Sequence, residues 1–253
     1  MPVNYVRGLT APQRTVRANR HLACLLAFVA GATNAGGFVA IGQYTSHMSG
    51  IVSSMAGAVG LGHPALFLSG SAALGGFLAG SACTALLVNF GRRQHLRGAY
   101  AYPLLLEAAL LLAFGGLGGF LQARHWLYVP LAAACLCFMM GLQNAIITKL
   151  SNAEIRTTHV TGMLTDIGIE LGKLAYWNRS GVIDGGVVRA DVTKLGVLTL
   201  LVGSFFAGGV AGAAGFAAMG FVLAIPLALV LLALTLVPAV DDARQFAERY
   251  AER

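Results

Sequence analysis

The chain has 253 residues, of which 57% are hydrophobic and only 11% are charged, and its mean hydropathy is +0.73. Soluble domains carry about 25% charged residues, so this composition excludes an ordinary soluble enzyme or binding domain. The net charge of +7 would suit nucleic acid, but basic residues of membrane proteins gather in cytoplasmic loops. We therefore expect no nucleic-acid partner.

Apolar runs of about 20 residues, long enough to cross a bilayer core of about 30 Å, recur along the chain. They predict an all-α polytopic membrane protein with six transmembrane helices. The predicted spans are residues 21–41, 65–90, 102–121, 129–150, 195–215 and 217–237. Residues 1–20 are expected to form a cytoplasmic N-terminal arm, and residues 238–253 a cytoplasmic C-terminal tail.

The cations predict the orientation of these spans. With the N-terminus in the cytoplasm, all of the seventeen lysines and arginines except Arg124 fall on the cytoplasmic side, which is the positive-inside pattern. A complete extra span at residues 46–62 would move the basic cluster at residues 92–97 outside. Residues 42–62 are therefore expected to re-enter the membrane or to lie on its surface, and both termini to be cytoplasmic.

The two halves of the chain resemble each other. GATNA at residues 31–35 matches GLQNA at 141–145, TSHMSG at 45–50 matches TTHVTG at 157–162, and FLAG at 77–80 resembles FAGG at 206–209. These matches predict two repeats, at residues 21–121 and 129–237, each with a re-entrant helix after its first span, at 42–62 and 151–175. Because each repeat has three spans, the second is expected to be inverted, as in many transporters.

Each hexapeptide precedes an apolar stretch that is too short to cross a bilayer. A helix that begins at membrane depth needs partners for its free N–H groups, so Thr45 or Ser46 is expected to cap the first short helix, and Thr157 or Thr158 the second. Two helix N-termini that meet at mid-membrane would favour a polar or anionic solute. The predicted solute-binding residues are Asn34, Thr45, His47, Ser49, Gly50, Asn144, Arg156, Thr158, His159, Thr161 and Gly162.

An alternative interpretation assigns these residues to structure alone. The serines and threonines then only cap and pack helices, and the amides of Asn34 and Asn144 bond neighbouring helices. The Gly-rich stretches at residues 75–80 and 208–212 predict close helix packing, either within one subunit or between subunits of a homo-oligomer.

Two carboxylates are candidates for proton coupling. Glu107 is the only acidic residue well inside a predicted span, where carboxylates are costly and usually functional, although it also lies close enough to the helix start to reach the cytoplasmic interface. Asp166 on the second short helix either pairs with Arg156 or His159 or carries a proton. Glu170 and Lys173 are expected to form an ordinary surface pair.

The motif GATNA with TSHMSG, and the motif GLQNA with RTTHVTGMLTDIGIELG at residues 156–172, resemble the YoaK-like family of bacterial inner-membrane proteins of unknown function. The resemblance covers nearly the whole chain. That family often has Asp at the position of Asn34 and Asn at the position of Ile51, so the resemblance implies no proton carrier at position 34 here. It implies a location in the inner membrane and no settled substrate.

We therefore expect a multi-pass transporter of the cytoplasmic (inner) membrane that moves a small polar or anionic solute by alternating access, with proton coupling left open. A passive channel is the main alternative. A membrane-embedded enzyme is a further one, although the chain has no HExxH, serine-elbow or cysteine-ligand motif. No enzyme activity, catalytic residue, metal or cofactor is predicted. The expected partners are the solute, the lipid bilayer and a second copy of the chain.

Overall fold

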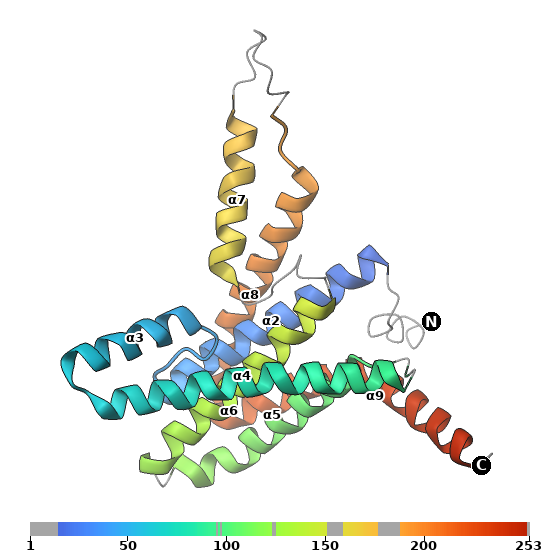
Figure 1. Ribbon diagram of the computed structural model, residues 1–253, viewed down its shortest axis with the longest axis horizontal. Coiled ribbons are helices and arrows are strands. Elements are labelled where there is room, and N and C mark those ends of the chain that lie inside the picture. The colour runs from blue at the N-terminus through green and yellow to red at the C-terminus, as the bar shows by residue number, and fades with distance from the viewer. Residues whose placement is uncertain are drawn as a thin grey trace.

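The computed structural model describes residues 15–94, 96, 98–122, 125–150, 159–176 and 188–251, and within these residues it contains helices and no β-strand. The long helices of this part are α2 (Val16–Ile41), α4 (Pro64–Arg93), α5 (Ala101–Gln122), α6 (His125–Leu150), α8 (Val192–Met219) and α9 (Ala224–Ala251). Two short helices, α3 (Met48–Leu61) and α7 (Val160–Ala175), and a 3-10 turn, η1 (Gly220–Leu223), complete it (Figure 1).

Four stretches of the described chain are long and apolar enough to cross a membrane. They are Arg17–Ile41, Pro64–Arg93, Pro130–Lys149 and Val192–Arg244, the last of which runs through α8, η1 and α9. Large apolar side chains cover much of the outer surface, and Leu68, Leu86 and Phe206 are each 71% exposed. Because extensive apolar surface on long helices faces lipid rather than water, the chain is a multi-pass membrane protein.

The helix ends follow local sequence signals. The Thr15 side chain accepts a hydrogen bond from the Ala18 N–H at the start of α2, and the Asp191 side chain accepts one from the Lys194 N–H at the start of α8. Gly42 and Gly62 end α2 and α3 in the left-handed region, each with φ +73°, which costs glycine little. Helix α9 continues through Pro238 to Ala251, well past the predicted end of the last span.

Glycines allow the long helices to approach one another closely. The most extensive packing joins α2 to α8, α4 to α6 and α5 to α9. A Cβ added to Gly31 would lie 2.0 Å from the carbonyl oxygen of Phe205, and one added to Gly80 would lie 2.0 Å from that of Phe138. The predicted close packing is therefore confirmed within one chain, with contacts of this kind at Gly76, Gly80, Gly208 and Gly212.

The contacts also give the relative directions of the helices. In α2 and α8, Phe28 meets Gly208 and Ala32 meets Gly212, so the two helices advance together and are parallel. Contacts of Gly76 with Ala134 and of Gly80 with Phe138 show that α4 and α6 are likewise parallel.

Two other pairs are antiparallel. In α2 and α6, Leu26 meets Gln143 whereas the later Gly37 meets Leu136. In α5 and α9, the late Gly115 meets the first residue of α9, Ala224, and the loop residue Gly98, just before α5, meets Asp242. Helices α2 and α5 therefore begin at the end of the body where α4, α6 and α9 approach their C-termini.

We call this end the basic end. Among the residues whose side chains are described, the lysines and arginines lie there or on the α7–α8 hairpin: Arg17, Arg20, Arg92, Arg93, Lys149, Lys173, Arg189, Lys194 and Arg244. The opposite end, where α2 finishes and α4 begins, carries the α3–α4 hairpin. Figure 1 shows the two hairpins as separate arms, α3 with the start of α4 and α7 with the start of α8.

The first turns of the short helices pack at mid-length of the long ones. Ile51 of α3 clusters with Ala73 of α4 and Cys137 of α6, and Cys137 is close to the middle of its helix. Met163 of α7 clusters in the same way with residues that include Ala27, in the middle of α2. Both short helices thus begin at the middle of the body, and each runs outward into its own arm (Figure 1).

Candidate functional site

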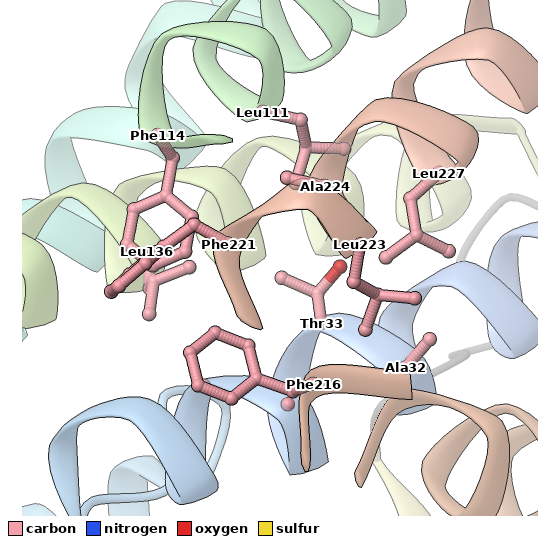
Figure 2. A pocket seen from close by; sticks show the side chains of 12 residues that line it. Ala32, Thr33, Leu111, Phe114, Leu136, Phe216, Phe221, Leu223, Ala224 and Leu227 are labelled. Carbon is pink, nitrogen blue, oxygen red and sulfur yellow. The ribbon is translucent and has the colours of Figure 1, made fainter. Parts of the chain in front are cut away.

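A small cavity lies where α2, α5, α6, α8, η1 and α9 converge. Its volume is about 20 Å³, which is room for about one water molecule. The lining residues, shown in Figure 2, are Ala32, Thr33, Gly36, Gly37, Leu111, Phe114, Leu136, Phe216, Phe221, Leu223, Ala224 and Leu227. The hydroxyl of Thr33 is the polar side-chain group among them. The two glycines of α2 leave space that larger side chains would fill.

The first hexapeptide, residues 45–50, is held beside this cavity by the side chain of Asn34. Its side-chain oxygen accepts hydrogen bonds from the backbone N–H of Thr45, at 2.9 Å, and of Ser46, at 3.0 Å. Thr45 is fully buried, and its methyl group is close enough to touch a Cβ added to the cavity-lining Gly37. Asn34 therefore fixes the turn that leads from α2 into α3. The structure brings Asn34 and Thr45 together, as a shared site requires.

The predicted caps of the short helices are wrong. His47 occupies the N-cap position of α3 and His159 that of α7, and neither makes a side-chain capping bond. Thr45 and Ser46 instead use their backbone N–H groups to bond Asn34. At α3 the reason is geometric, because the turn first closes back onto Asn34 of α2, and the N-cap moves to His47, one residue after Ser46 and two after Thr45.

Each of these histidines folds over the glycine three residues later. A Cβ on Gly50 would lie 2.1 Å from a ring carbon of His47, and one on Gly162 would lie 2.8 Å from Nδ1 of His159. His47 and His159 are both exposed, as are Ser49 and Thr161 in the first turns of the two helices. The predicted residues His47, Ser49, His159 and Thr161 therefore lie on the surface of the body, and none of them lines the cavity.

The remaining predicted site residues divide into two groups. Asn144 of α6 is half-buried and donates a hydrogen bond from its Nδ2 to the Met140 carbonyl within its own helix. The predictions at Arg156 and Thr158, and the predicted capping residue Thr157, fall outside the described residues.

Several buried side-chain oxygen atoms lack hydrogen-bond partners within the described chain, and one of them belongs to the cavity-lining Thr33. Among the described residues they are Thr33 Oγ1, Gln143 Oε1 and both carboxyl oxygens of Glu107. Glu107 and Gln143 are 0% exposed, and Thr33 is 4% exposed. The Gln143 amide nitrogen donates to the Leu26 carbonyl, at 3.1 Å, which holds α6 against α2. Since buried polar groups are nearly always paired, these oxygens indicate a site for water, a proton or a solute donor.

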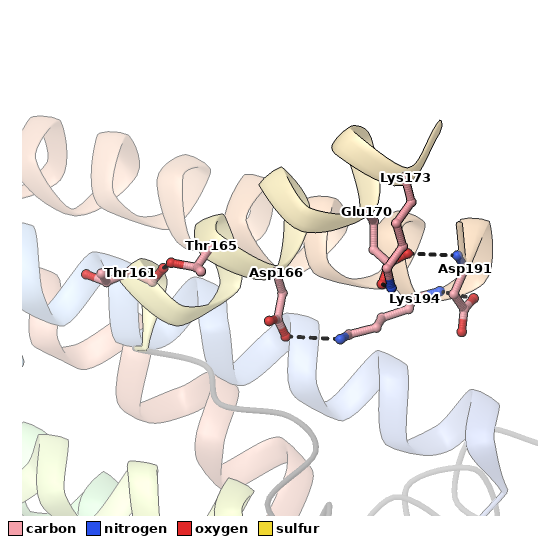
Figure 3. A network of polar contacts seen from close by, with 7 residues as sticks. All are labelled: Thr161, Thr165, Asp166, Glu170, Lys173, Asp191 and Lys194. Carbon is pink, nitrogen blue, oxygen red and sulfur yellow. Dashed lines mark hydrogen bonds and ion pairs between the residues drawn. The ribbon is translucent and has the colours of Figure 1, made fainter. Parts of the chain in front are cut away.

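Asp166 pairs with Lys194 rather than with His159, whereas Arg156, the other partner considered for it, lies outside the described residues. Its carboxylate lies 3.2 Å from the Lys194 ammonium of α8, not against His159 (Figure 3). The predicted pair of Glu170 and Lys173 is confirmed, at 2.9 Å. Glu170 is also buried and accepts a hydrogen bond from the Asp191 N–H, at 2.8 Å, so the pair is more than a surface contact. These bonds from Lys173 and Asp191 lower the pKa of the Glu170 carboxyl.

A second polar cluster closes the basic end. The Arg92 guanidinium donates to the Tyr100 hydroxyl, which in turn donates to the Lys149 carbonyl of α6, at 3.4 Å. The buried carboxylate of Asp242 accepts a hydrogen bond from the Gly98 N–H, at 2.9 Å, and another from the Tyr102 hydroxyl. The loop between α4 and α5 is thereby tied to both α6 and α9.

Sequence reasoning missed Thr33, Gln143, Tyr100 and Asp242. The first two had a usable signal, since each directly precedes the asparagine of the matched motifs GATNA and GLQNA. Asp242 lay in the segment interpreted as a tail, and only the continuation of α9 shows that it is buried. No sequence pattern marks Tyr100, because interfacial tyrosines are common at span ends.

Comparison with known proteins gives one match. Residues 22–237 match the family described as "Protein of unknown function (DUF1275)". This agrees with the resemblance to a membrane-protein family of unknown function. No curated protein and no solved structure matches the chain.

Proposed function

The chain belongs to the DUF1275 family of proteins of unknown function, and from this premise we propose that it is a membrane transporter for a small polar solute. In this proposal, the chain crosses the membrane six times as two inverted repeats, α2–α5 and α6–α9. The solute site is the cavity beside Thr33 and the Asn34–Thr45 turn. The observation that carries the proposal is a set of helix contacts that recurs between the two halves.

The recurrence supports the repeats residue by residue. Gly31 of α2 meets Phe205 of α8, and Gly141 of α6 meets Phe77 of α4 in the reciprocal contact. Gly141 lies 110 residues after Gly31, and Phe77 lies 128 residues before Phe205. The same shifts relate the contact of Phe28 with Gly208 to that of Phe138 with Gly80. They match FLAG at residues 77–80 to residues 205–208, one residue earlier than the match made from sequence alone.

The cluster at the start of each short helix recurs as well. Ile51, Ala73 and Cys137 surround the first turn of α3, and the equivalent positions in the other half are Met163, Leu201 and Ala27, which belong to the cluster at the first turn of α7. Helices α5 and α9 begin with the similar sequences AYPL and AIPL. These reciprocal contacts favour a repeat over chance similarity between two apolar halves.

The helix directions support inversion. Helix α4 is parallel to α6, and α2 is parallel to α8 and antiparallel to α6, so equivalent helices of the two halves point in opposite directions. Helices α3 and α7 accordingly enter from opposite ends and begin at mid-length. Such broken, opposed helices surround the solute sites of inverted-repeat transporters. Irregular backbone at mid-membrane depth is tolerated where it lines protein or water.

The two ends of the helical body differ in how tightly they are packed, and this difference favours alternating access over an open channel. The cavity lies toward the end opposite the basic one, whereas the basic end is packed and tied by the contacts of Tyr100 and Asp242. A cavity of about 20 Å³ is too small for a solute larger than water, so the helices must part to admit one. A passive channel would need a path open at both ends.

The distribution of charge supports a location in the cytoplasmic membrane with the basic end inside. Lysines and arginines gather at that end among the described residues, as the positive-inside pattern requires. The N-terminal arm and the end of α9 then face the cytoplasm, as the sequence predicts.

Solute flux in proteoliposomes tests the function. The purified full-length chain is reconstituted, and uptake of labelled neutral, anionic and cationic polar solutes of increasing size is compared with empty liposomes. The proposal expects at least one solute to enter faster than into empty liposomes and to compete with its unlabelled form. Folded protein that moves no member of the panel would contradict it.

A further inference from the structure

We infer that Glu107 is a proton-binding site placed between the solute cavity and the sealed basic end, and that its proton drives the solute. This inference rests on the proposed function and names its coupling ion. It also selects between the two carboxylates considered from sequence, since Asp166 is half-exposed and paired with Lys194 whereas Glu107 has neither solvent nor a partner among the described residues.

The burial of Glu107 determines which form it takes in this structure. Its side chain is 0% exposed, and both carboxyl oxygens lack hydrogen-bond partners within the described chain. The neighbouring residues on the same face of α5, Leu104, Ala108 and Leu111, belong to the main apolar cluster. An ionised carboxylate in such surroundings would be costly enough to take up a proton instead. The structure therefore holds Glu107 in its neutral, protonated form.

The position of Glu107 along α5 links it to the cavity. Leu111, one turn further along the helix, lines the cavity, and Phe114 lies beyond it. Because α5 and α9 are antiparallel between the contacts of Gly98 with Asp242 and of Gly115 with Ala224, Glu107 lies about halfway along their packed length. One helical turn of α5 therefore separates Glu107 from the lining of the cavity.

The other side of Glu107 is closed by larger side chains. The matched motifs make Ile146 and Ile147 of α6 the counterparts of Gly36 and Gly37, which leave the cavity open in α2. Both isoleucines are buried in the same cluster as Leu104, one turn before Glu107, and Tyr100. The space that is open in one half is therefore filled in the other. Glu107 lies at the boundary, where access from either side can alternate.

Other ionisable groups on the helices packed against α5 have roles elsewhere or lie at the basic end. Asp242 bonds Gly98 and Tyr102, and Arg92 bonds Tyr100. The remaining groups on α4, α6 and α9 are Cys83, Arg93, Cys135, Cys137, Lys149, Asp241 and Arg244. No described contact joins any of them to Glu107.

Glu107 exchanges its proton with water in both steps of the proposed cycle. When the cavity opens, the carboxylate takes a proton from hydronium and releases water, and the resulting neutral carboxyl can be buried. When the basic end opens, the carboxyl returns its proton to water and becomes ionised, which favours the hydrated state. The inward proton gradient thus supplies a bias between the two states.

Infrared spectroscopy of the reconstituted full-length chain tests the site without a known solute. We expect a carbonyl band of a protonated carboxyl at neutral pH, which shifts when the protein is labelled with ¹³C-glutamate and disappears in Glu107→Gln. The matched controls, Asp166→Asn and Glu170→Gln, should retain the band. A Glu107→Gln spectrum equal to that of the wild type, or a band insensitive to the glutamate label, would overturn the inference.

Two further experiments keep the test decisive. If Glu107→Gln does not fold, Glu107→Asp retains a carboxyl and should move the band, and an unmoved band would count against the inference. Once a solute is known, Glu107→Gln should abolish accumulation driven by an imposed pH gradient while exchange of the solute continues. A band that passes the test without any solute flux would leave the proton site standing and refute the transporter. Flux without the band would do the reverse.

Discussion

Gly31 of α2 lies against the backbone of Phe205 of α8, so closely that a Cβ on Gly31 would come within 2.0 Å of the Phe205 carbonyl oxygen. We predict that Gly31→Ala forces the two helices apart and destabilises the protein by about 3 kcal/mol or more, since overpacking by one methyl already costs about 1–3 kcal/mol. Thermal unfolding of the purified protein in detergent measures this loss.

The reciprocal contact supplies a second test of the same point. Gly141→Ala should be as harmful as Gly31→Ala, because its Cβ would lie 2.1 Å from the Phe77 carbonyl oxygen. Gly203→Ala on α8 is the matched control, since nothing lies within 4 Å of its added Cβ, and it should be neutral or mildly stabilising. Equal melting temperatures for all three variants would show that the contact is wrong.

Asn34 is predicted to act through its side-chain oxygen, which accepts bonds from the N–H groups of Thr45 and Ser46. Asn34→Ala leaves these two N–H groups without this acceptor, and a buried N–H without a partner costs about 1–3 kcal/mol. Asn34→Asp keeps an acceptor and should be tolerated better. Hydrogen exchange of the 45–46 amides measures the effect directly. Equal protection in the two variants would rule out this role.

The lowered pKa of the Glu170 carboxyl predicts that the stability of the α7–α8 hairpin depends on pH. Hydrogen bonds from Lys173 and from the Asp191 N–H lower its pKa in the folded state. Its stabilising contribution is therefore present above the ordinary glutamate pKa, about 4.3, and is lost as the pH falls through the lowered value. Hydrogen exchange of α7 should speed up on acidification in the wild type. The Glu170→Gln variant should show faster exchange already at neutral pH and a weaker acid response.

Inversion of the repeats predicts opposite exposure of the two hairpin turns. His63 lies in the turn between α3 and α4, and Tyr176 ends α7. In a background without the native cysteines, a membrane-impermeant thiol reagent added outside intact cells should label His63→Cys and spare Tyr176→Cys. Inside-out vesicles should give the reverse. Labelling of both from the same side would refute inversion.

Much of the helical framework follows from the sequence, and particular residues show why. Apolar runs locate the long helices, and the hexapeptides locate both short ones. These signals can be read from the sequence because the length of an apolar run is a local property of the chain. The motif pair GATNA and GLQNA also pointed to Asn34, whose bond to Thr45 places the turn beside the cavity.

The sequence does not predict which residues of distant helices come into contact. Lys194 follows Asp166 by 28 residues, so no helical spacing connects them, and their ion pair appears only once α7 packs on α8. The cavity was hidden for the same reason, because its lining comes from segments spread between Ala32 and Leu227. The capping error at Thr45 arose because capping rules describe a helix alone, whereas this turn is fixed by the Asn34 side chain of another helix.

The most direct measurement of the central claim is solute uptake by a variant whose cavity is filled. Gly37 lines the cavity, and an added Cβ there would meet the end of the Leu136 side chain, at 3.1 Å, and the methyl group of Thr45, at 3.8 Å. Gly116→Leu is the control, since nothing lies within 4 Å of an added Cβ on that exposed residue. For any solute that the wild type transports, the account predicts that Gly37→Leu abolishes uptake into proteoliposomes while Gly116→Leu retains it. Undiminished uptake by folded Gly37→Leu protein would contradict a solute path through this cavity.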